Sequence, residues 1–170
     1  MQNGGLKIEN RGKTIWFNLS RPRVRNALDA LLISALRTAI EKVSISFSSS
    51  PASSPRAVIL TGDGPDEAPF CAGADLSWMT GESEKGLGNL FDTLSSIRSC
   101  PIPVIARVTG PASGGGAGLV SACDMAFSGG SSASIAFPEA RLGLVPAMVS
   151  SFALRRAGPA HCSRMFLTGD

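Results

Sequence analysis

The sequence contains a single histidine, His161, among its 170 residues. A catalytic serine usually needs a histidine base, and zinc sites of the usual Cys/His type need several such ligands. His161 follows Gly-Pro-Ala near an expected helix start, so we predict a surface or capping residue. The four cysteines lie far apart without a C-x-x-C pair. A chain of this length and cysteine content favours reduced, mostly buried thiols over a disulfide framework, and no metal site is expected.

Long apolar runs and strong net charge are also absent. Each apolar stretch is interrupted by Arg, Pro or Gly before it reaches the length that crosses a bilayer. The net charge of +3 is far from the concentrated basic stripe of nucleic-acid-binding proteins. Residues 1–11 have neither the apolar core of a signal peptide nor an Arg/Ser-rich amphipathic stretch. We therefore expect neither a membrane nor a nucleic acid as partner, and we identify no targeting segment.

Strand-like and helix-like patterns alternate along the chain, which predicts a single α/β domain over residues 1–170. Residues 44–55, rich in Ser and Pro, are interpreted as an exposed loop within it. The expected strands are 6–8, 14–19, 56–61, 103–108, 125–127 and 134–137. The expected helices are 27–43 with Asn26 as N-cap, a short one from about Asp75, 87–97, 117–124, 150–157 and 160–167.

Two segments share one design, a buried strand followed by a small-residue loop and a helix start. They are Phe-Cys-Ala-Gly-Ala-Asp-Leu at 70–76 and Ser-Gly-Gly-Gly-Ala at 113–117. Small residues let a ligand approach the backbone, and free N–H groups at a helix start attract negative charge. If both turns converge, they form an oxyanion hole with two donors. Taken alone, each turn indicates no more than close packing. Neither fits a P-loop, a G-x-G-x-x-G fingerprint or, at Ser113, a G-x-S-x-G elbow.

Further motifs follow in order and extend the pattern over nearly the whole chain. They are 21–22 with 26–28, 70–76, 103–106 with 114–116, 122–124, 137–139 and 142–146. Together they resemble the enoyl-CoA hydratase/isomerase (crotonase) family. The resemblance implies a crotonase-type spiral of strand–strand–helix units, with the C-terminal helical part missing from this chain. Residues 73–79, 116–124 and 139–147 look most like the 3-methylglutaconyl-CoA hydratase branch, which acts in leucine or isoprenoid breakdown.

The resemblance also implies roles for individual residues. It places two donors for the thioester oxygen on the backbone N–H groups of Ala74 and Gly115, and the general acid/base on Glu139. It assigns coenzyme A contacts as follows: Arg23 and Val24 in the opening loop, then Ala72, Asp75 and Leu76 along the pantetheine and adenine path, with Gly114 beside the second turn. Arg21, Arg23 and Arg25 face either coenzyme A phosphates or solvent. No metal or redox cofactor is implied, because coenzyme A arrives with the substrate.

One departure from the family pattern leaves the reaction open. Hydratases of this family often use two glutamates, and the earlier one would stand where this sequence has Gly118. A hydratase with Glu139 alone, a Δ3,Δ2-enoyl-CoA isomerase, and an inactive acyl-CoA-binding or structural partner of full-length paralogues all fit. Without the resemblance, Glu139 would be a surface residue paired with Arg141. The family forms trimers or pairs of trimers, so we expect a homo-oligomer, in the cytoplasm or, with a presequence outside this sequence, the mitochondrial matrix.

Overall fold

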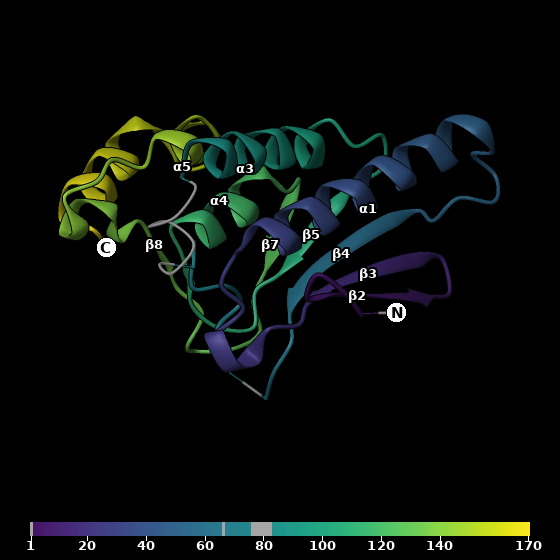
Figure 1. The fold of residues 1–170 in the computed structure, drawn as a ribbon, viewed down its shortest axis with the longest axis horizontal. Coiled ribbons are helices and arrows are strands. Elements are labelled where there is room, and N and C mark those ends of the chain that lie inside the picture. The colour runs from purple at the N-terminus through teal and green to yellow at the C-terminus, as the bar shows by residue number, and fades with distance from the viewer. Residues whose placement is uncertain (1, 66, 76–82) are drawn as a thin grey trace.

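The computed structural model describes residues 2–65, 67–75 and 83–170 of the chain (Figure 1). Its main sheet has six strands in the order β1-β2-β3-β4-β5-β7. The first three, β1 (Gln2–Asn3), β2 (Leu6–Arg11) and β3 (Thr14–Leu19), pair antiparallel, whereas β3, β4 (Ala57–Gly62), β5 (Val104–Arg107) and β7 (Met125–Phe127) run parallel. Two short strands, β6 (Ala112–Ser113) and β8 (Ile135–Ala136), form a separate parallel pair.

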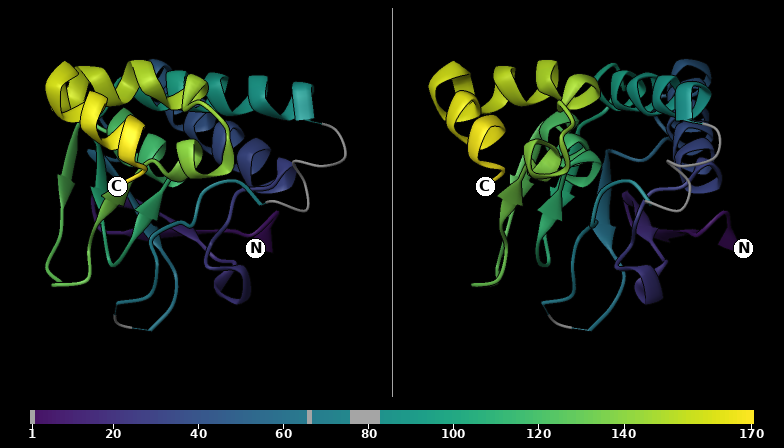
Figure 2. Two further views of the ribbon diagram at one scale, coloured as in Figure 1. Left: turned by 90° about the vertical axis from the view of Figure 1, so that its left-hand side faces the viewer. Right: turned by 60° about the vertical axis from the view of Figure 1, so that its left-hand side comes forward.

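The helices gather on one side of the main sheet (Figure 2). They are α1 (Ala30–Ser49), α3 (Ser83–Arg98), α4 (Gly115–Ala122) and α5 (Ala147–Thr168), and two 3-10 turns, η1 (Pro22–Val24) and η2 (Pro138–Leu142), join them to the strands. The apolar stripe of α1 packs on the sheet through Leu32, Leu36 and Ile40, each no more than 1 % exposed. Among the described residues no helix combines the length and apolar composition that a bilayer span needs.

The sheet order explains why the two glycine-bearing turns meet. β4 and β5 are neighbouring parallel strands, with Val58 opposite Val104. The segments that leave their carboxyl ends therefore start side by side. Farther along, Cys71 bridges Ala112 in a parallel pair, and Ser113 N–H donates to the Cys71 carbonyl at 3.0 Å. The convergence that the sequence only suggested thus follows from strand pairing.

The alternation of strands and helices predicted from the sequence is confirmed, with shifts at the boundaries. The two C-terminal helices appear as one element, α5, broken by a kink at Gly158 (φ 78°, ψ 162°) before Pro159. Proline lacks the N–H that would continue the helix, so the break falls where the sequence suggested it. The short helix expected after Asp75 lies outside the described residues.

The interpretation of residues 44–55 as a loop is wrong for its first half. α1 continues to Ser49, and only residues 50–56 connect it to β4. The hydroxyls of Ser44, Ser48 and Ser49 donate to carbonyls four residues earlier, at 3.0 to 3.1 Å, which lets these serines remain helical. Phe47 also packs against the core and favours the extra turn.

The predicted N-cap of this helix is wrong as well. Asp29, not Asn26, caps α1: its Oδ1 accepts the Leu32 N–H at 2.8 Å. Residue 28 is held in a strand-like bridge to Ala74, so the helix cannot begin before it. Asn26 is buried in a left-handed conformation (φ 56°), and its amide donates to the Asp63 and Pro69 carbonyls at 3.0 Å each. It therefore joins loops rather than starting a helix.

Candidate active site

A pocket of about 260 Å³ opens where the two glycine-bearing turns face η2 and the start of α5. One wall is backbone-rich and comes from Ala72, Gly73, Ala74, Gly114 and Gly115. The other residues around it are mostly apolar: Leu90, Pro138, Glu139, Leu142, Leu144, Val145, Pro146, Ala147, Met148 and Val149. Within this described lining, Glu139 alone has an ionisable side chain. The site therefore offers one acid or base in apolar surroundings.

The backbone at Ala74 is fixed by a bridge to Leu28. Leu28 N–H donates to the Gly73 carbonyl, and Asp75 N–H donates to the Leu28 carbonyl, both at 2.8 Å. Because these bonds use the groups on either side of Ala74, the N–H of Ala74 itself points to the opposite side. Gly73 supplies the turn with φ 93°, a conformation that other residues rarely adopt.

The second donor lies at the start of α4. Gly115 is the first residue of the helix, so its N–H has no acceptor within the helix. A Cβ built on Gly115 would lie 3.8 Å from the Ala74 nitrogen, and one built on Gly73 would lie 3.6 Å from the Gly115 nitrogen. Among the described residues no acceptor is bonded to either N–H. Two free donors thus stand side by side at the pocket, as an oxyanion hole requires.

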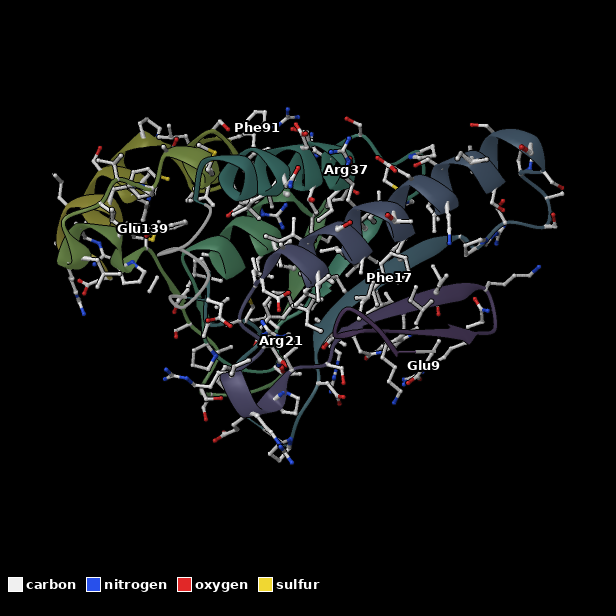
Figure 3. The ribbon with its side chains drawn as sticks, viewed as in Figure 1. Glu9, Phe17, Arg21, Arg37, Phe91 and Glu139 are labelled. Carbon is white, nitrogen blue, oxygen red and sulfur yellow. The ribbon has the colours of Figure 1, made fainter. Side chains whose placement is uncertain are left out.

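Glu139 lies on η2 (Figure 3) and lines the same pocket as these donors. A Cβ built on Gly114 would lie 3.1 Å from Glu139 Oε1, so the carboxyl group packs on the second turn. Oε2 is buried and has no hydrogen-bond partner within the described part of the chain. This burial raises the pKa of Glu139 above its ordinary value, and the opposing effect of its own backbone N–H is smaller. A raised pKa makes the carboxyl group hold a proton more readily, which suits a group that accepts and returns one.

The alternative in which Glu139 simply pairs with Arg141 does not hold. The Arg141 guanidinium instead reaches the chain end, donating to Asp170 Oδ1 at 2.6 Å and to the Thr168 carbonyl at 3.0 Å. The sequence neighbour that would have neutralised Glu139 is therefore engaged elsewhere. His161 is exposed on α5, as predicted for a surface residue.

Cys71 lies directly behind the first turn, fully buried. Burial raises the pKa of its thiol to about 12, so it stays protonated and is no thiolate nucleophile. Cys123 and Cys162 are buried too, and Cys100 is half-buried. The prediction of mostly buried, free thiols is confirmed.

Gly118 is buried on α4 and faces α5. A Cβ at this position would collide with Val149 Cγ1 and lie 3.1 Å from Val149 Cβ and 3.4 Å from Leu94 Cδ1. No larger side chain fits there while α5 keeps its place. The sequence has glycine at residue 118, where many hydratases of the family have a glutamate. The close packing of α5 against α4 agrees with that small residue.

Apart from Asp75, the predicted coenzyme A contacts fall into three groups: the exposed loop residues, the pocket residues Ala72 and Gly114, and Leu76. Arg23, Val24 and Arg25 are exposed on the loop around η1, where they are open to solvent. Ala72 lines the pocket and donates its N–H to the Arg25 carbonyl at 3.0 Å, which joins that loop to the first turn. Leu76 lies outside the described residues.

Arg21 does not belong with the exposed arginines. Its guanidinium contacts Asp29 Oδ2 at 2.9 Å, Asp75 Oδ2 at 3.2 Å and the Ala27 carbonyl at 2.5 Å. The expectation that it faces coenzyme A phosphates is wrong, because these internal partners already use it. Asp75 is likewise turned toward Arg21. Three closely spaced arginines gave no sign of which one was internal, although the acidic Asp75 within the 70–76 motif indicated a possible partner.

Comparison with known proteins shows the family of the chain. Residues 10–170 match the family model described as enoyl-CoA hydratase/isomerase. The chain is 34% identical to an enoyl-CoA isomerase/hydratase of Zymoseptoria tritici, covering 96% of this chain and 53% of that protein. It is 30% identical to a mitochondrial methylglutaconyl-CoA hydratase of Pyricularia oryzae, covering 96% and 54%. The chain thus spans about half the length of these curated relatives.

Solved structures give the same result for the fold. An enoyl-CoA hydratase of Mycobacterium smegmatis superimposes with a TM-score of 0.87 at 30% identity, covering 98% of this chain and 63% of that one. A putative enoyl-CoA hydratase/isomerase (crotonase) from Legionella pneumophila gives 0.86 at 31%, with 98% and 63% covered. The predicted crotonase-type α/β fold is confirmed. From its strands, its paired turns and these matches, the chain belongs to the enoyl-CoA hydratase/isomerase family.

Proposed function

We propose that this chain carries the thioester-binding part of an enzyme that adds water across the α,β double bond of an enoyl-CoA. The observation that supports it most is the meeting of three groups in one pocket: the free N–H groups of Ala74 and Gly115, and the carboxyl group of Glu139. The donors suit a carbonyl oxygen that gains negative charge, and the carboxyl group suits proton transfer.

In this proposal the reaction runs through an enolate. Glu139 accepts a proton from water while the oxygen of that water bonds to the β-carbon. The electron pair of the double bond moves toward the thioester, and the resulting oxyanion is held by Ala74 and Gly115. Glu139 then returns a proton to the α-carbon, so that the net change is the addition of one water molecule. The loss of one donor from such a hole typically costs ~10²–10³ in rate.

The second candidate is a Δ3,Δ2-enoyl-CoA isomerase, and the packing at Gly118 favours it. Residue 118 is a glycine with Val149 packed beside it, and Glu139 is the one carboxylic acid in the described lining. A single carboxyl group is enough to take a proton from the α-carbon and return it to the γ-carbon. The same two donors would hold the intermediate enolate.

The apolar lining indicates an uncharged acyl group. A free carboxylate on the acyl group would meet no cation among the described lining residues, and burying an unpaired charge is costly. 3-Methylglutaconyl-CoA carries such a carboxylate, so its turnover is a direct test of the branch assignment. We propose that coenzyme A enters as part of the substrate, past the exposed Arg23 and Val24, with no further cofactor.

Self-association belongs to the same proposal. The outer strand β7 exposes Met125 and Phe127, 50% and 62% accessible, at the edge of the main sheet. Exposed apolar edges are rare on isolated monomers. Sedimentation velocity would distinguish a trimer or hexamer from a monomer.

The deciding experiment follows the mass and the absorbance of acyl-CoA substrates. Crotonyl-CoA, 3-methylglutaconyl-CoA and a 3-enoyl-CoA are incubated with the chain, with Glu139→Gln and with Arg141→Gln, a neighbouring control that leaves the pocket unchanged. A water adduct lost only in Glu139→Gln supports the hydratase. Conjugation of the 3-enoyl-CoA at constant mass, lost in the same variant, supports the isomerase. No change with any substrate would reject both and leave a non-catalytic acyl-CoA binder.

A further inference from the structure

Arg21 connects the opening loop, the start of α1 and the first turn of the site. Its Nη2 contacts both Asp29 and Asp75, and its Nη1 donates to the Ala27 carbonyl. The three charged side chains are only 21%, 23% and 18% exposed, so solvent screens them less than it screens surface pairs. Figure 3 places Arg21 beneath α1, at the level of the loop that leads into that helix.

The ion pair between Arg21 and Asp29 is fixed at both residues. Asp29 is the N-cap of α1, through its bond to Leu32 N–H. The backbone of Arg21 is tied to Asn26 in both directions, its N–H donating to Asn26 Oδ1 at 3.0 Å and its carbonyl accepting the Asn26 N–H at 2.9 Å. These contacts hold the Arg21 guanidinium in place independently of its contact with Asp75.

Asp75 is the residue that follows the donor Ala74. Its backbone N–H is bonded to Leu28, and its side chain is bonded to Arg21. Asp75, which follows the peptide group that carries the Ala74 N–H, is therefore fixed through both its main chain and its side chain. A donor that must meet an oxyanion cannot rotate freely, because a misplacement of about 1 Å can cost 10²-fold in rate.

We propose that Arg21 is a positioning residue that fixes the direction of the Ala74 N–H through Asp75. The inference rests on the proposed function, since it assigns a supporting residue to the proposed oxyanion hole. Arginine suits the task because its planar fork serves two carboxylates and a carbonyl at once, whereas lysine offers a single point charge.

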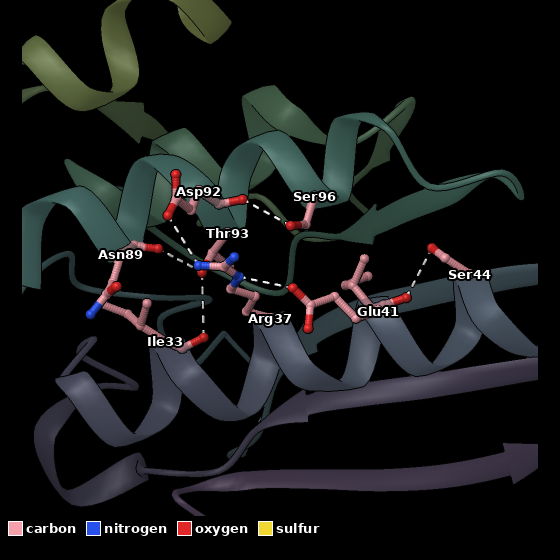
Figure 4. A network of polar contacts seen from close by, with 9 residues as sticks. Ile33, Arg37, Glu41, Ser44, Asn89, Asp92, Thr93 and Ser96 are labelled. Carbon is pink, nitrogen blue, oxygen red and sulfur yellow. Dashed lines mark hydrogen bonds and ion pairs between the residues drawn. The ribbon is translucent and has the colours of Figure 1, made fainter.

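The test measures polarisation of the bound carbonyl as well as turnover. Cinnamoyl-CoA is used as probe, because the absorption of its conjugated thioester moves to longer wavelength when hydrogen bonds polarise the carbonyl. The variants are Arg21→Met, Arg21→Lys and Asp75→Asn. Arg37→Met is the matched control: Arg37 also bridges two carboxylates, Glu41 at 2.9 Å and Asp92 at 3.0 Å, but between α1 and α3, outside the pocket lining (Figure 4).

We expect the parent chain and Arg37→Met to show the full shift with saturating cinnamoyl-CoA. Arg21→Met should lose most of it, with kcat on the substrate that the parent turns over lower by ~10- to 100-fold and KM little changed. Arg21→Lys should lie between the two. A full shift in Arg21→Met, with only a lower unfolding midpoint, would make the residue merely structural and overturn the inference.

Two further outcomes are informative. If Arg21→Met does not fold, Asp75→Asn serves as the test, because it leaves the pairing of Arg21 with Asp29 intact. A lost absorption shift in Asp75→Asn supports the inference, and a full shift overturns it. If the parent chain binds cinnamoyl-CoA without any shift, the proposed oxyanion hole itself is wrong and the role of Arg21 falls with it. The failure of the proposed function is thereby separated from the failure of this inference.

Discussion

The contact between Gly118 of α4 and Val149 of α5 allows a quantitative prediction. A methyl group at residue 118 would collide with Val149 Cγ1, while ordinary carbon contacts lie near 3.5–4.0 Å. Val149 is 2% exposed, so its side chain is packed against neighbours and moving it disturbs those contacts. Overpacking of this kind costs at most about 3 kcal/mol in typical cases. Alanine recovers about 1 kcal/mol of helix propensity over glycine, so Gly118→Ala should lower the free energy of unfolding by about 2 kcal/mol.

The partner substitution should reverse this loss. Val149→Ala alone removes two buried methyl groups, worth roughly 0.8 kcal/mol each, plus a cavity term, for a total of about 2 kcal/mol. In the double variant the new methyl group at residue 118 occupies the vacated space. We expect a loss of only about 1 kcal/mol rather than the additive sum of about 4 kcal/mol, a coupling near the upper limit for contacting residues.

Urea unfolding of the parent, both single variants and the double variant, followed by circular dichroism, measures all four free energies. If the double variant loses the sum of the single losses to within about 0.5 kcal/mol, the two positions are independent. The reasoning about how α5 is seated would then be refuted.

Three further predictions concern the site and its supports. Gly116→Ala places a Cβ against the Cys71 carbonyl and 2.8 Å from Cys71 Cβ, so it should separate the two donors and lower kcat by ~10²-fold in a steady-state assay with the preferred enoyl-CoA. The raised pKa of Glu139 means that its charged form is disfavoured in the folded state. Relative to Glu139→Gln, the parent should therefore lose stability as pH rises from about 4 through that raised pKa. Urea midpoints of the two proteins that run parallel across pH would contradict this prediction. Asn26→Ala leaves two carbonyls and the Arg21 N–H without their partner and should cost about 3 kcal/mol or more in the same unfolding assay.

The sequence predicted the position of the two turns better than the supports around them. Small residues after two buried strands indicated close ligand approach, and the parallel pairing of β4 with β5 brings those turns together. The pattern of residues could not show that α1 runs to Ser49, because serines favour loops by type, whereas here Phe47 packs against the core and the serine hydroxyls bond within the helix.

The sequence could not predict the long-range polar partners, for a different reason. Asn26 and Asp29 are both good N-caps by type, and only the bridge between Leu28 and Ala74 decides between them. The pairing of Arg21 with Asp75 joins residues 54 positions apart, a contact that no local pattern encodes. Whether Arg23 and Val24 contact coenzyme A stays a prediction.

The two walls of the pocket have separate origins in the chain. The turns that present Ala74 and Gly115 are fixed by the sheet and by α4, whereas residues 142–149 form the facing wall from η2 and the start of α5. In the proposed function, substitutions in the second wall would therefore change which acyl groups fit without disturbing the hold on the thioester. If that function holds, a pocket divided in this way would let the range of substrates change while the reaction stays the same.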